Sequence, residues 1–155
     1  ALATPSPAAA APPAPGGEVL LVVSGAIDAP NVGGEARFDL AALESLPRHA
    51  FETLSPWSET RHRFEGVRLD TLLAAVGARS ERFEALGLDD YRVTFENVDL
   101  VRYPVIVAWR QDGREIGVRE LGPLRIVFPF DDHPELLTAT NEALSVWQLV
   151  AMDVR

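Results

Sequence analysis

The sequence contains neither cysteine nor lysine, and both absences narrow the range of functions. Without cysteine the chain cannot form disulfides, use thiol catalysis or hold an iron–sulfur cluster or another thiolate-bound metal. All 14 basic residues are therefore arginines, and 23 acidic residues outnumber them to give a net charge of -9. Because an acidic protein repels the phosphates of nucleic acids and anionic lipids, we expect no nucleic-acid partner. Every apolar run is far shorter than the roughly 20 residues of a membrane helix, so no membrane span is predicted.

The length and composition indicate one soluble domain behind a linker. The chain has 155 residues, of which 47% are hydrophobic and 24% charged. Residues 1–17 are rich in Ala and Pro and carry no charge, which predicts a disordered, semi-rigid linker before a domain of residues 18–155. Ala1-Leu2-Ala3 is similar to the small-residue end of a secretory signal region, so we expect an exported, periplasmic protein. The alternative is that residue 1 lies inside a longer disordered tail.

The pattern of strands and helices predicts an α+β fold. Helices are expected at 38–46, with Asp39 as the N-cap, and at 69–76, where apolar residues follow helical spacing up to Gly77. Strands are expected at 18–26, 50–54, 91–95, 105–110, 114–118, 124–130 and 145–154, with a polar loop at 131–141. Because the elements mix without a regular βαβ alternation, we expect a mixed, largely antiparallel sheet with short helices.

Common catalytic motifs are absent or weak. There is no glycine-rich phosphate loop, and Ser55 and Ser58 lack the strand–elbow surroundings of an acyl-transfer nucleophile. A metal could be held by Asp131, Asp132 and His133, although this pattern is also typical of a solvated acidic loop. We therefore predict no catalytic residue and keep this cluster as a weak alternative metal site.

The triplet Arg61-His62-Arg63 is the strongest candidate for ligand binding. Guanidinium groups bind sulfate, phosphate or carboxylate through paired hydrogen bonds, and a Trp-containing turn precedes the triplet. We expect a pocket for a small anionic or aromatic ligand, lined by Trp57, Arg61, His62, Arg63 and Tyr91. The alternative is that these arginines pair on the surface with Glu52, Glu59 and Glu65. Tryptophans are in general more typical of a core than of a ligand platform, and this applies to Trp57, Trp109 and Trp147.

Several short blocks follow one another along the chain. They are Glu52-Thr53 with Ser55-Pro56-Trp57, Phe64-Glu65-Gly66-Val67-Arg68-Leu69 with the helix after it, Asp89-Asp90-Tyr91, the 105–118 hairpin, Gly122-Pro123-Leu124-Arg125-Ile126-Val127-Phe128-Pro129, and Val146-Trp147-Gln148-Leu149. In this order they resemble the molybdopterin-dependent oxidoreductase domain of the sulfite oxidase type. The resemblance covers almost all of 18–155, and within that family the chain looks like the small, single-domain, exported members.

This resemblance implies a mixed α+β fold and a molybdenum held by a pterin dithiolene. Such enzymes, which include sulfite oxidase and the periplasmic methionine-sulfoxide reductase subunit, transfer an oxygen atom and two electrons. In them a cysteine thiolate ligates the metal, and basic residues after the Gly-Pro-Leu-Arg strand hold the pterin phosphate. Here the cysteine position falls near Leu54, which cannot ligate molybdenum. The loop is Asp131-Asp132-His133-Pro134-Glu135, whose charge opposes a phosphate.

Two functions are consistent with these departures. The first is an exported, non-catalytic module without a cofactor, which binds a small ligand or acts as an accessory or sensory part of an envelope system with a protein partner. The alternative is a molybdopterin-dependent oxidoreductase whose metal lacks a protein thiolate.

Overall fold

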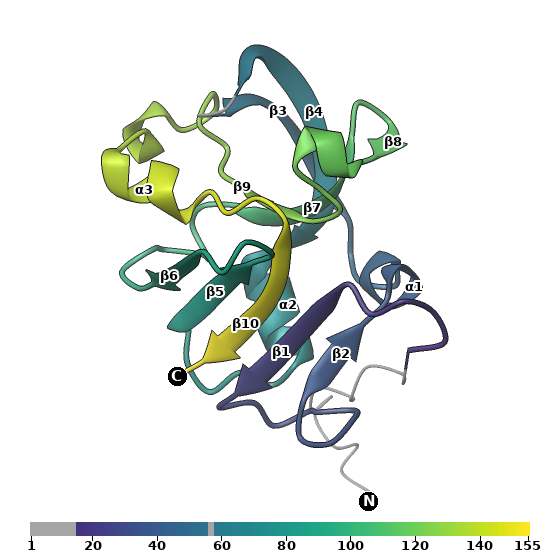
Figure 1. Ribbon diagram of the computed structural model, residues 1–155. Helices are drawn as coiled ribbons and strands as arrows, with labels where there is room; N and C mark the ends of the chain where they lie inside the picture. Colours follow the sequence, from purple (N-terminus) through teal and green to yellow (C-terminus); the bar gives the residue numbers. More distant parts are fainter. Residues whose placement is uncertain (1–14, 56–57) are drawn as a thin grey trace, which may run out of the picture.

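Two sheets form the framework of the protein (Figure 1). The computed structural model describes residues 15–55 and 58–155, and ten strands lie within these ranges. The first sheet contains, in spatial order, β2 (Ala36–Phe38), β1 (Leu21–Gly25), β10 (Leu149–Val154), β5 (Phe83–Gly87) and β6 (Arg92–Phe95). The second contains β3 (His49–Ser55), β4 (Ser58–Arg68), β7 (Ile106–Gln111) and β8 (Arg114–Glu115), with β9 (Arg125–Val127) paired to β7.

Short helical segments connect these strands. They are α1 (Leu40–Glu44), α2 (Leu69–Ala75), α3 (Ala139–Leu144) and the 3-10 turns η1 (Val118–Glu120) and η2 (Pro134–Leu136). Among the described strands β1 and β10 pair in parallel, and the other pairs are antiparallel. The predicted α+β class with a mixed, largely antiparallel arrangement is therefore confirmed. Within the described residues, no helix combines the length and apolar character that crossing a membrane requires.

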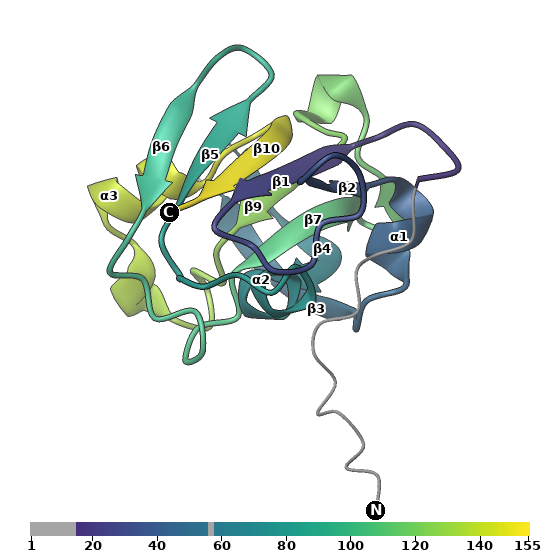
Figure 2. The same cartoon turned by 90° about the horizontal axis from the view of Figure 1, so that it is seen from below.

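A common core joins the two sheets. Helix α2 lies against one face of the first sheet (Figure 2), and its buried Leu69, Leu72 and Leu73 belong to the same cluster as side chains of both sheets. Aromatic rings extend this contact, since Phe95 of β6 stacks on Phe83 at 4.6 Å between ring centroids and lies 6.1 Å from Phe128 after β9. The core therefore fixes β9 and the segment after it against the first sheet.

The second sheet is also buried on its opposite face. Phe51, Phe64, Ile106 and Val127 form a second cluster there with Ala108 and Ile116. Strand β4 pairs with β7, and beside the register shift at Gly66 an added Cβ would lie 1.9 Å from the carbonyl oxygen of Val107. Only glycine therefore fits at this point of the pairing, and it is the glycine of the Phe-x-Gly-Val block.

One carboxylate ties the start of the domain to α1. Asp39 is the N-cap, as predicted, and accepts a hydrogen bond from the Ala42 amide at 2.8 Å. It also accepts bonds from the amides of Gly16 and Gly17 at 3.1 Å, at the end of the predicted linker. The Ala42 amide foremost holds the pKa of Asp39 below its ordinary value. Residues 1–14, which make up most of that predicted linker, lie outside the described residues.

The structure differs from the sequence-based prediction in several elements. The predicted loop at 131–141 contains η2 and the beginning of α3, where the Thr138 hydroxyl caps the helix by accepting from the Asn141 amide. Strands β2 and β5 are absent from the prediction, and β4 extends through the charged triplet, where no strand is predicted. The predicted final strand begins at Leu149 instead of Ser145.

We predict that Asp39→Ala lowers the urea midpoint of unfolding at neutral pH, because three backbone amides lose their acceptor. A carboxyl with a lowered pKa in the folded state stabilises the fold above its ordinary pKa of 3.8, and this contribution is lost as the pH falls through the lower folded pKa. The difference between the wild type and the variant should therefore shrink in acid. An equal difference at neutral pH and at about pH 2 would show that the charge does not contribute.

Candidate ligand-binding site

The predicted basic triplet lies in the middle of β4, where each basic group already has an acidic partner. Arg61 Nε donates to Asp131 Oδ2 at 2.5 Å, and Arg63 Nε lies 3.4 Å from Glu65 Oε1. His62 Nδ1 is 2.6 Å from Asp112 Oδ2, and the pKa of Asp112 is lowered first by the Arg63 amide and then by this contact. The two arginines are more than half exposed. The triplet is therefore a surface segment whose basic groups lie beside carboxylates.

Tyr91 lies apart from this triplet. It follows β5, and its hydroxyl donates to the carbonyl oxygen of Ala143 in α3 at 2.7 Å. It lines a pocket of about 320 Å³ together with Ser145 and Trp147. No contact among the described residues joins Tyr91 to the triplet, so the structure does not bring the predicted site together. Trp57 lies outside the described residues.

Trp147, which lines this pocket, is paired with Arg125, which is not one of the lining residues. The two residues form an antiparallel bridge, so their side chains leave the backbone on the same face with Cβ atoms about 5 Å apart. The indole of Trp147 is half-buried and lines the pocket, whereas Trp109 lies in the core as tryptophans usually do. An aromatic surface and a guanidinium group therefore emerge from paired positions.

Arg125 is a buried cation that no described carboxylate neutralises. Its exposed fraction is 6%, its Nη1 lies 3.4 Å from Gln111 Oε1, and its guanidinium lies over the Phe64 ring at 5.3 Å. Burial lowers the pKa of Arg125 to about 10, so the group is still charged at neutral pH. A buried charge with one weak neutral acceptor is unusual, because buried charges are normally paired.

Sequence reasoning missed Arg125 as a site residue, although it lies in the quoted Gly-Pro-Leu-Arg block. The available signal was an arginine inside the apolar run Leu124–Phe130, where the neighbouring residues on the strand are buried. Such a position is costly for a charge, and so it suggests a role beyond stability. The basic triplet indicates a ligand site because its charges are adjacent in sequence. Adjacent residues of a strand, however, point to opposite faces of the sheet.

The alternative metal site does not assemble among the described residues. The Asp131 carboxylate contacts Arg61 and the Leu54 amide, and the His133 ring packs edge-on against Tyr103 at 5.1 Å. The nearest acidic partner of His133 is Glu135 at 3.9 Å, and Asp132 is exposed. No group of three or more His, Asp or Glu side chains in the described part of the chain could hold a metal ion.

Comparison with known proteins bears on the fold. No protein-family model and no curated protein sequence matches the chain. The structure is similar to that of the sulfane dehydrogenase SoxCD from Paracoccus pantotrophus, with a TM-score of 0.62 and 19% identity over 86% of this chain. The fold is of the sulfite-oxidase type. The chain spans 37% of the SoxCD chain that it matches, so the likeness concerns the molybdopterin-oxidoreductase-like fold alone.

The residues at the position implied for a molybdenum–pterin group do not fit that group. Leu54 has no donor atom in its side chain, and its amide nitrogen lies 3.4 Å from Asp131 Oδ1. The Asp131 amide in turn donates to Thr53 Oγ1 at 3.3 Å, so the acidic loop closes against the end of β3. A carboxylate there contributes negative charge where a pterin phosphate needs positive charge. Arg125 is a cation, but it supplies no soft ligand for a metal.

We predict that Arg125→Met stabilises the protein by roughly 1–3 kcal/mol at neutral pH, because the variant removes an unpaired buried charge. The folded pKa of about 10 lies below the ordinary 12.5, so the charge costs stability below about pH 10 and the cost fades as the pH rises further. Urea unfolding at several pH values measures this difference. Arg119→Met, at an exposed arginine, should leave stability unchanged. A loss of stability in Arg125→Met would show that the guanidinium supports the fold.

Proposed function

We propose that the protein is a non-catalytic, exported module that binds a small aromatic ligand with an anionic or carbonyl edge. The observation that supports this most strongly is the buried, unpaired guanidinium of Arg125 beside the indole of Trp147. The ligand's acceptor edge would meet Arg125, and its ring would lie against Trp147 and Tyr91. We prefer this site to the predicted fork of Arg61 and Arg63, because these two arginines lie beside the carboxylates of Asp131 and Glu65.

The guanidinium of Arg125 determines which polar group the ligand should carry. Among the described residues its Nη1 has one acceptor, the amide oxygen of Gln111, at the long distance of 3.4 Å. A guanidinium carries five N–H donors, and a carboxylate or carbonyl can accept two of them in parallel. Inside the protein, where water does not compete, such a charge-assisted pair is much stronger than on the surface.

The aromatic side chains select the apolar part of the ligand. Trp147 and Tyr91 line a pocket of about 320 Å³, a volume at the lower end of the small-molecule sites found in proteins. Aromatic rings stack in offset or edge-to-face arrangements and contribute beyond their buried area. The Ser145 side chain is buried and occupied, since its hydroxyl donates to the Asn141 carbonyl. The exposed Glu142 carboxylate also lines the pocket, so the aromatic side chains favour a planar ring whose anionic or carbonyl edge faces Arg125 instead.

Accessory or sensory action in an envelope system is part of this proposal. It is supported by the resemblance to the small, exported, single-domain relatives and by the absence of a soft metal ligand in a cysteine-free chain. A module of this kind would report the presence of its ligand to a partner protein of the envelope.

We predict that indole-3-carboxylate binds at least about tenfold more tightly than indole or acetate, because it alone engages both Arg125 and Trp147. Isothermal calorimetry on the whole chain would measure this. Arg125→Met should remove the advantage of the carboxylate, and Trp147→Ala should weaken indole-3-carboxylate and indole alike. The double variant Arg61→Ala and Arg63→Ala is the matched control and should bind like the wild type. Loss of binding in this control, with Arg125→Met unaffected, would return the site to the triplet.

The oxidoreductase alternative rests on the fold. We expect no stoichiometric molybdenum in protein purified from molybdenum-replete cells of its native host, because neither Leu54 nor Asp131 fits the group. Elemental analysis and a visible absorption spectrum measure this directly. Molybdenum at one atom per chain would overturn the non-catalytic proposal in favour of the alternative.

A further inference from the structure

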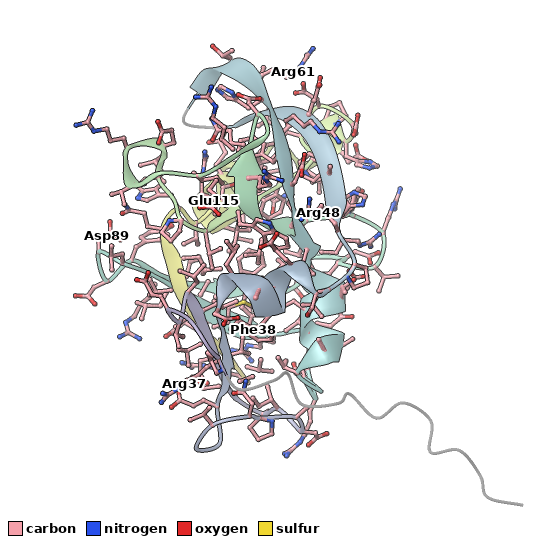
Figure 3. The ribbon with its side chains drawn as sticks, turned by 90° about the vertical axis from the view of Figure 1, so that its right-hand side faces the viewer. Arg37, Phe38, Arg48, Arg61, Asp89 and Glu115 are labelled. Carbon is pink, nitrogen blue, oxygen red and sulfur yellow. The ribbon has the colours of Figure 1, made fainter. Side chains whose placement is uncertain are left out.

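A groove of about 770 Å³ lies on the side of the molecule that carries α1, away from the ligand pocket. Three segments line it: residues 16–20, the start of α1, and residues 115–123. Figure 3 shows this side, with Glu115 lying above α1 and Phe38 beside that helix. The groove shares no lining residue with the pocket at Tyr91 and Trp147, so the two can be tested separately.

The inside of this groove is largely apolar. Leu20, Leu40, Ile116 and Pro123 contribute to its lining, and the Val118 side chain at its edge is 67% exposed. Gly16, Gly17 and Gly117 add backbone without side chains. An apolar groove bordered by polar groups is typical of a site for another molecule.

Unpaired acidic side chains lie in and beside the groove. Glu18 and Glu115 line it, and Glu120 lines an adjoining hollow that shares Glu115, Ile116 and Gly117 with it and is also lined by Arg114. None of these three glutamates forms an ion pair with a described residue. Most ion pairs of the described surface instead join arginines to other carboxylates, as with Arg61 and Arg63. The other acidic group of the lining, Asp39, is occupied by three backbone amides.

We propose that this groove binds a basic, apolar segment of a partner protein. Apolar side chains of the segment would enter the groove, and its Lys or Arg side chains would meet Glu18, Glu115 and Glu120. A second copy of this chain fits poorly, because its net charge is -9 and two like-charged molecules repel each other. The chain's own residues 1–14 carry no charge that could match the glutamates.

The test uses a fluorescein-labelled octapeptide of alternating leucine and arginine, titrated into the whole chain and followed by anisotropy. Two control peptides alternate serine with arginine and leucine with glutamate. We expect the leucine–arginine peptide to bind tightest and the leucine–glutamate peptide not to bind. The double variant Glu18→Gln and Glu115→Gln should weaken binding about tenfold, since it removes two matching charges. Amide NMR signals of Gly16, Gly17 and Gly117 should shift on binding.

The matched control is the double variant Glu52→Gln and Glu81→Gln, which removes two exposed, unpaired carboxylates outside the groove lining and should leave the affinity unchanged. Equal binding of the serine–arginine peptide would overturn the proposal, because attraction to an acidic surface would then suffice. Equal weakening by the two double variants, or shifts confined to residues outside the groove, would also overturn it. A dimer in sedimentation that Glu18→Gln with Glu115→Gln abolishes would assign the groove to a second copy instead.

Discussion

The close pairing of β4 with β7 at Gly66 is the constraint on which the second sheet depends. An added Cβ at Gly66 would meet the Val107 carbonyl oxygen, so only glycine lets the two strands lie this close, and the sheet that they form is buried on both faces. One face joins α2 and the first sheet in the common core. The other face holds Phe64, and it is over this ring that the guanidinium of Arg125 lies. A residue larger than glycine at position 66 would force the β4 and β7 backbones apart.

Burial on that second face gives Arg125 its chemical character. An arginine on the surface, such as Arg61 or Arg63, stays hydrated and costs little folding free energy. Its ion pairs also add little to stability. The same side chain inside the protein loses most of its water, which lowers its pKa, and no described carboxylate pairs with it. A buried charge that lowers the stability of the free protein can bind a ligand acceptor strongly. Such an exchange of stability for binding is common at functional sites.

The backbone arrangement of this protein does not depend on the residues that would bind a metal. The likeness to SoxCD concerns the backbone arrangement, which apolar packing and strand pairing maintain without regard to a bound group. The residues that would decide metal chemistry, Leu54 and Asp131, are held by contacts with each other and with Arg61. The same framework can therefore present a different set of functional groups.

Local patterns in the sequence determined the fold class, the absence of thiol chemistry, the Asp39 cap and the helix that ends before Gly77, because each depends on residues close together in the chain. The tertiary structure alone decided which charges are free. Arg125 and Trp147 are more than twenty positions apart in sequence and become neighbours through a bridge that no local pattern encodes. The triplet on β4 meets its acidic partners through contacts such as that between Arg61 and Asp131, which are likewise distant in sequence. The sequence shows which residues carry charge, but only the folded structure determines which charged side chains are buried and which form ion pairs.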